Sequence, residues 1–170
     1  HIGVLIAKEQ ERLDTAASED AFNKLQEKKI ALTYGKDEGF TNLNGADAVQ
    51  RPVYAEWTKK FDQQRQDIEK RLGNDRQREL FNHRAGIARA EFQGSIMKYA
   101  ASETDKYEAS IYRSTLDTET RNIGANPTSD FTAKISMERV GAAAERESAR
   151  QGRSKPEELA NARANAMDHL

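Results

Sequence analysis

The segment Tyr34–Val49, YGKDEGFTNLNGADAV, carries the side chains that first suggest chemistry. Asp37, Asn42, Asn44 and Asp47 supply carboxylate and amide oxygens, which are the ligands that calcium prefers. Loops of the EF-hand type follow the order D-x-[DN]-x-[DN]-G and close on a glutamate, and this segment has neither feature. A weak calcium site therefore stays open only as an alternative interpretation.

A structural corner explains the same segment better. Its glycines, Gly35, Gly39 and Gly45, allow the chain reversal that so few residues require, and we expect positive φ among them. Phe40 and Leu43 are expected to point inward and to cover the end of the following helix. This interpretation predicts no bound ion, cofactor or substrate at the corner.

The histidines and the other carboxylates form no group with the spacing of a catalytic site. His1, His83 and His169 are isolated from one another, and none has the spacing of a metal-ligand pair. Asp75 and Glu79 stand four residues apart, but arginines surround them and an acidic helix start explains Asp75 without chemistry. No hydrolase, zinc-protease, P-loop or dinucleotide-binding motif occurs. We therefore expect no catalytic, cofactor-binding or metal-binding residue and a protein that is not an enzyme.

The composition restricts the classes of partner. The 170 residues include 27 basic and 28 acidic side chains, and this balance does not favour DNA, RNA or an anionic membrane. There is no cysteine, which excludes disulfides, thiolate metal sites and a cysteine nucleophile. The apolar run HIGVLIA, residues 1–7, is far too short to span a bilayer, so no membrane span is expected. It is interpreted as the exposed end of a longer chain, or as a strand-like or helical stub that packs on a partner.

Apolar residues at helical spacing predict a chain made of helices. The predicted helices cover residues 8–33, 46–72, 75–121 and 128–151, followed by a last helix that reaches residue 170. Pro52 is placed in the first turns of the second helix, where a missing N–H is tolerated. Because no proline occurs between Pro52 and Pro127, the third helix should run unbroken across Gly94 and Ser102. The predicted fold class is all-α, an elongated helical hairpin or bundle with one long central helix.

Glycine and capping signals set the predicted boundaries. The segment 73–75, GND, should join the second and third helices as a tight antiparallel hairpin. Gly124 is expected to stop the third helix and Gly152 the fourth. Ser154 and Glu157 have the spacing of a capping box for the last helix. The predicted division of the chain is an N-terminal extension with the start of the first helix (1–20), a long helical hairpin (21–125) and a C-terminal helical pair (126–170).

Two segments, QRPVYAEWTKKF and ARAEFQGSIMKY, alternate basic residues with aromatics, as single-strand nucleic-acid binders do. Their aromatics fall on a helical core stripe, however, and we expect Trp57, Phe61, Phe81 and Phe92 to be buried together at the end of the hairpin. The locally basic segment RVGAAAERESARQGRSK mixes both signs of charge, which is typical of a solvated helix face. Nucleic acid is therefore disfavoured as a partner.

Four segments, in order, resemble a helical module of large bacteriophage virion proteins: ALTYGKDEGFTNLNGADAV, GNDRQRELF, NPTSDFTAKISMERV and GRSKPEELANARANAMDHL. The resemblance covers residues 21–170 and rests on turn and capping signals. Virion proteins of this kind are tail-associated or internal, ejection-type proteins, and they are often prophage-encoded. Some are joined to a peptidoglycan-degrading domain, and no catalytic residue of such a domain is present here.

The resemblance implies a structural or assembly module in the virion or the bacterial host cytoplasm. Such a module would pack its helices against copies of itself or neighbouring virion proteins and would have no small-molecule substrate. A bacterial cytoplasmic coiled-coil adaptor or chaperone is the alternative.

Overall fold

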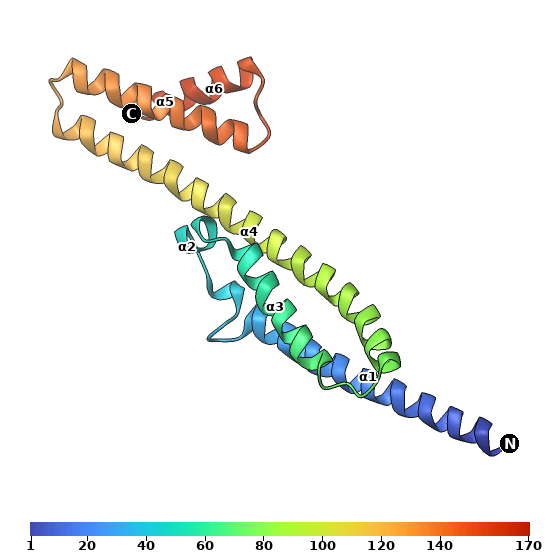
Figure 1. The fold of residues 1–170 in the computed structure, drawn as a ribbon. Helices are drawn as coiled ribbons and strands as arrows, with labels where there is room; N and C mark the ends of the chain where they lie inside the picture. Colours follow the sequence, from blue (N-terminus) through green and yellow to red (C-terminus); the bar gives the residue numbers. More distant parts are fainter. The chain divides into compact units, whose positions relative to one another are not determined.

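The computed structural model describes all residues from His1 to Leu170, and it contains helices and no strand. The all-α fold class predicted from the sequence is confirmed (Figure 1). The elements in chain order are α1 (Ile2–Tyr34), the 3-10 turn η1 (Phe40–Asn42), α2 (Ala46–Gln50), α3 (Val53–Glu69), α4 (Asp75–Ala125), α5 (Asp130–Arg150) and α6 (Pro156–Met167).

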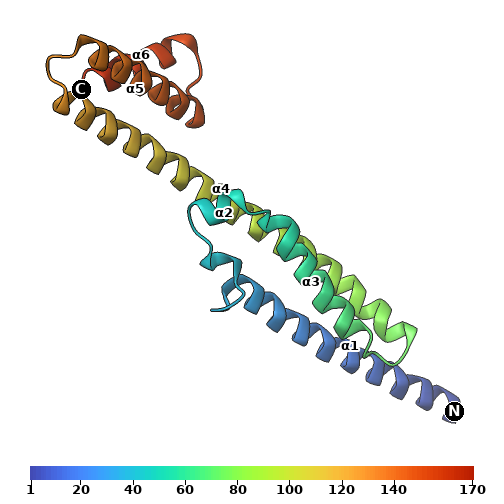
Figure 2. The ribbon, with the colours of Figure 1, turned by 60° about the vertical axis from the view of Figure 1, so that its left-hand side comes forward.

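The chain forms two compact units, residues 1–104 and 105–170, and α4 contributes to both. In the first unit, α1, α3 and the first part of α4 lie side by side (Figures 1 and 2). In the second unit, the last part of α4 packs with α5 and α6. Each unit has a hydrophobic core of its own.

The long helix α4 has 51 residues and continues through Gly94 and Ser102, as the absence of proline predicted. At 1.5 Å per residue it is about 75 Å long. The expectation that Gly124 stops it is wrong, because Gly124 lies inside its last turn. The helix ends at Ala125, just before Asn126-Pro127, since a residue that precedes proline is driven away from helical angles.

The predicted second helix is interrupted at Pro52. The short helix α2 ends at Gln50, Arg51 is extended at φ −82° and ψ 140°, and α3 begins at Val53. Placing Pro52 inside one helix was wrong because its ring disfavours helical angles at Arg51. The helix α3 also ends at Glu69, three residues before the predicted Leu72.

The hairpin of α3 and α4 is antiparallel, as predicted. Asn74 caps α4, since its Oδ1 accepts the backbone N–H of Gln77 at 2.9 Å. Contacts then run in opposite directions along the two helices, from Glu69 with Asn82 to Asp62 with Arg89.

The core of the first unit contains the four predicted aromatics, all of them buried. The rings of Phe61 and Phe92 stack with centroids 5.1 Å apart. The four aromatics are not gathered at one end of the hairpin, which corrects that part of the prediction. Trp57 lies in the first half of α3 and Phe81 near the start of α4, and in an antiparallel pair these positions lie toward opposite ends.

The second unit has a core of smaller residues, in which Val140, Ala144 and Ala166 are buried. A Cβ on Gly141 would lie 2.8 Å from the guanidinium carbon of Arg163, so α6 approaches α5 closely at this point. The fourth predicted helix is confirmed with Ser129 as its N-cap, which accepts from the N–H of Thr132 at 3.1 Å.

Several helix ends differ from prediction by a few residues. The helix α1 starts at Ile2 and not at Lys8, so the run HIGVLIA is helical. The predicted capping box of α6 is shifted by one residue: the N-cap is Lys155, whose N–H is accepted by Glu158 at 3.0 Å, with Pro156 as the first helical residue. Pro156 fixes this register because its φ suits the first helical position. The helix also ends at Met167 and does not continue to Leu170.

Candidate functional site

The corner Tyr34–Val49 requires its glycines for two different reasons. Gly45 has a positive φ of 55°, which confirms that expectation at one position. Gly35 and Gly39 have φ of −58° and −69°, but a Cβ there would lie 2.3 Å from the Ala31 oxygen and 2.6 Å from the Gly35 oxygen, respectively. Close backbone approach therefore selects glycine at these two positions.

The corner is fastened to the core by aromatic residues. Phe40 is buried, with its ring 5.9 Å from that of Phe92 and 5.5 Å from that of Tyr99. The indole N–H of Trp57 donates to the Glu38 oxygen at 2.8 Å, and the Tyr99 hydroxyl donates to the Thr41 oxygen at 2.9 Å. Leu43 packs against the same core, so both predicted anchors point inward.

The residues considered as calcium ligands do not form a cluster. Asp37, Asn44 and Asp47 are exposed, and the amide nitrogen of Asn42 donates to the backbone oxygens of Gly35 and Lys36. No group of three histidine, aspartate or glutamate side chains lies close enough anywhere to hold a metal ion.

The other residues considered for chemistry lie on the surface. His1, His83 and His169 are exposed. Asp75 forms an ion pair with Arg78 at 2.8 Å, and Glu79 forms one with Arg76 at 3.2 Å. These carboxylates therefore belong to an ordinary charged helix start.

The second unit contains a cavity of about 420 Å³ between α4 and α5, which we call the α4–α5 groove. Its lining is mixed, with two tyrosine rings, an isoleucine and an alanine beside charged residues of both signs. It is lined by Tyr107, Glu108, Ile111, Tyr112, Thr115, Ala143, Arg146 and Glu147.

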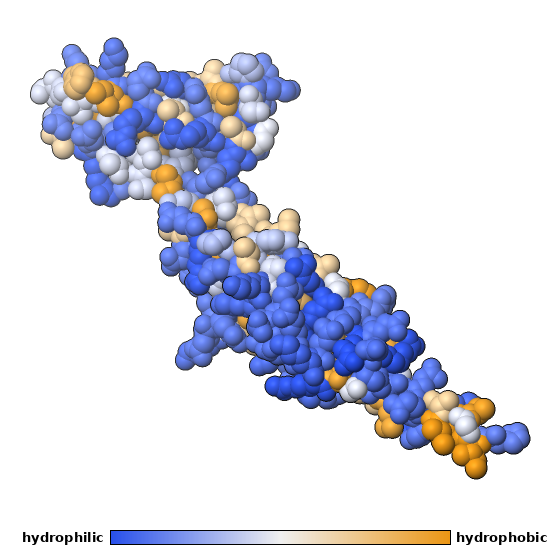
Figure 3. All heavy atoms as spheres, viewed as in Figure 1, coloured by the Kyte–Doolittle hydropathy of each residue, from blue (hydrophilic) through white to orange (hydrophobic).

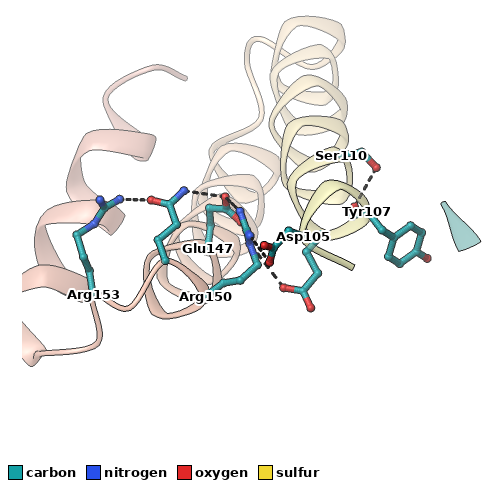
Figure 4. Close-up of polar contacts among 8 residues, drawn as sticks. Asp105, Tyr107, Ser110, Glu147, Arg150 and Arg153 are labelled. Atoms are coloured by element: carbon teal, nitrogen blue, oxygen red, sulfur yellow. Dashed lines mark hydrogen bonds and ion pairs between the residues drawn. The ribbon is translucent and has the colours of Figure 1, made fainter. Parts of the chain in front are cut away.

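An arginine-centred network fixes one end of this groove. The Arg150 guanidinium contacts Glu147 on its own helix at 2.6 Å and reaches Asp105 at 3.0 Å and Glu108 at 3.6 Å on α4 (Figure 4). The hydrogen bond from Arg150 lowers the pKa of Glu147, and the same bond raises the pKa of Arg150. Both groups therefore stay charged, and the network ties α5 to α4.

A buried carboxylate fastens the same two helices farther along. Glu119 is buried on α4, where it accepts the Ser136 hydroxyl at 2.7 Å and forms an ion pair with Arg139. Because α4 and α5 are tied at both places, the walls of the groove are held by the unit itself.

The groove offers one cation without a partner inside the chain. Arg146 is exposed and makes no ion pair or hydrogen bond, in contrast to Arg139 and Arg150 on the same helix. Burial, and then the charge of Glu147, raise the pKa of Tyr112, which stays a neutral phenol. This combination suits binding of an apolar segment that carries an acidic group.

The first unit presents an apolar helix face without a partner, which we call the α1 stripe. Ile2, Leu5, Ile6 and Leu13 are 75%, 66%, 64% and 54% exposed. At about 100° per residue they share one face, whereas the buried residues of α1, from Asp14 to Leu32, lie on another. The end of α1 carries a group of hydrophobic atoms in the space-filling view (Figure 3).

None of the helices combines the length and the apolar character needed to cross a membrane. Comparison with known proteins finds no matching family model, no similar curated protein and no similar solved structure.

Proposed function

We propose that this chain is a structural assembly module that acts by packing its helices against another protein. The observation that supports it most is the α1 stripe. Its large side chains are more than half exposed and lie off the face that α1 buries. Burying such residues contributes about 1.5–3 kcal/mol each, so a protein surface that covers them gains affinity.

The resemblance of residues 21–170 to a bacteriophage virion module supports a place in a phage or prophage particle. The partners would be neighbouring virion proteins or further copies of the chain, in the virion or in the host cytoplasm during assembly. The role has no catalytic step, and peptidoglycan lysis by the purified protein would contradict it.

A bacterial cytoplasmic adaptor or chaperone is the second candidate. The α4–α5 groove favours it, because a cavity with tyrosine rings and Ile111 beside an unpaired arginine could hold a helix of a client protein. The two candidates differ in where the protein resides after particle release.

Incorporation into particles tests the proposal. A prophage carrying the gene is induced, particles are purified, and the protein is quantified by mass spectrometry. We expect the wild-type protein in the particles and less of the Ile6→Asp variant. Thr15→Asp is the matched control, because Thr15 is exposed on the opposite face of α1. Absence of the wild-type protein from particles would favour the adaptor.

A further inference from the structure

We propose that the α1 stripe of one copy lies in the α4–α5 groove of a second copy. This inference rests on the proposed assembly function and names a second copy as the partner. It joins two features that the chain leaves unmatched, an exposed apolar helix face and a groove of mixed lining that contains an unpaired cation.

The two surfaces agree in length. Tyr107 and Thr115, both lining residues of the groove, are eight residues apart on α4, or about 12 Å. On the other copy, Ile2 to Glu9 covers about 10 Å of α1. This first part of the stripe, with Ile2, Leu5 and Ile6, therefore fits within the groove, whereas Leu13 lies beyond it.

One charge of the groove is also complementary, because its two carboxylates, Glu108 and Glu147, contact Arg150 and leave Arg146 without a partner. Glu9 lies on the same face of α1 as Ile6, and its only ion pair is the exposed one to Arg12 at 2.9 Å. Arg146 stands three residues after Ala143 on α5, as Glu9 stands three residues after Ile6 on α1. When α1 runs parallel to α5, Ile6 sits over the small Ala143 while Glu9 faces Arg146.

This contact is heterologous, because the stripe and the groove are different surfaces. A pair keeps one free groove on one copy and one free stripe on the other, so association continues into rings or open chains. The expected mass therefore rises with concentration beyond that of a dimer.

Sedimentation equilibrium of the full chain, with two complementary variants, tests the geometry. Ile6→Asp disables the stripe and Ile111→Asp disables the groove, and both positions are exposed, so circular dichroism should show unchanged helix content. Each variant alone should stay at the 19.1 kDa of one chain. Their equimolar mixture should reach twice that mass and stop, since only one intact stripe and one intact groove remain.

A charge exchange tests the register. Glu9→Arg and Arg146→Glu should each weaken association at least tenfold, and the double variant should recover it. Glu11→Arg is the control, because Glu11 lies on the opposite side of α1 from the stripe.

Other results would overturn the inference. Self-association of the Ile111→Asp variant alone would mean that stripes pair with stripes. A wild-type protein that stays monomeric at millimolar concentration would exclude docking of a second copy. Neither result would affect incorporation into particles, so the assembly function is judged separately.

Discussion

At the scale of single residues, position and not residue type decides what a polar or flexible residue does. Asp37 and Asp14 are both aspartates, but the first is exposed on the corner and the second is buried among amide donors. Glycine is required at Gly45 because φ is positive there, whereas at Gly35 and Gly39 it is required because a Cβ would collide with backbone atoms.

Replacing Gly45 by valine should destabilise the first unit by more than about 1 kcal/mol. The cost comes from the backbone, because a β-branched residue is strained at φ of 55° although the space for a Cβ is open. Denaturant unfolding followed by Trp57 fluorescence measures it.

The exposed Asp37→Asn variant is the control and should unfold at the wild-type midpoint. A calcium titration decides between corner and metal site. If micromolar calcium raised the melting temperature and Asp37→Asn abolished that gain, the corner interpretation would fail.

The buried Asp14 should make stability depend on acid pH. Hydrogen bonds from Asn74, Gln77 and Gln10 lower the pKa of its carboxyl group. Because the folded pKa lies below the unfolded value of about 3.9, the stabilisation is present above that value and is lost as pH falls through the folded pKa.

Asp14→Asn should therefore lower stability at pH 7 and flatten the decline below pH 4. Denaturant midpoints measured from pH 2 to pH 7 test both effects. Asp37→Asn should keep the wild-type slope, and an equally steep decline in Asp14→Asn would show that other groups cause it.

At the scale of elements, helix α4 carries glycines that the packing of the first unit does not require. Gly86 and Gly94 lie in the helix interior, are exposed, and have nothing within 4 Å of an added Cβ. Glycine at such positions reduces helix stability relative to alanine.

Gly86→Ala and Gly94→Ala should each stabilise the protein by roughly 0.5–1 kcal/mol. Gly141→Ala should instead destabilise it, because the new methyl group would displace the Arg163 side chain from α5. Denaturant unfolding compares all three. A loss of stability in the α4 variants would mean that another surface packs on this face.

At the scale of the whole molecule, the two units have cores of different quality. The first buries aromatic and branched residues such as Phe61, Phe92 and Leu25, whereas the second buries Val140 and several alanines. Larger buried side chains remove more apolar area from water and stabilise more.

We therefore expect the second unit to unfold at a lower temperature than the first. The only tryptophan, Trp57, reports on the first unit, and far-ultraviolet circular dichroism reports on both. Loss of ellipticity should begin before the Trp57 emission shifts. Val140→Ala should lower the midpoint temperature of the early loss of ellipticity and leave that of the Trp57 transition unchanged. Coincident transitions in that variant would disprove independent unfolding.

Local signals were sufficient for much of the fold. Apolar spacing located the helices, the segment 73–75 was recognised as the cap of α4, and Phe40 and Leu43 were recognised as anchors. The errors at Pro52 and Ser154 were also local: the effect of proline on neighbouring residues was underestimated. Phe131 and Ile135 of α5 are exposed although they are large and apolar, whereas Val140 is buried in the core.

The sequence by itself determined the all-α class, the unbroken α4 and the corner, because helix periodicity, capping and turn geometry depend on residues a few positions apart. Only the tertiary structure decided which distant residues meet. Arg150 joins Asp105 across 45 residues, and Asp14 meets Asn74 across 60. No periodicity encodes such pairs, since they depend on how two helices are aligned. The α4–α5 groove and its unpaired Arg146 therefore became visible only in the folded chain.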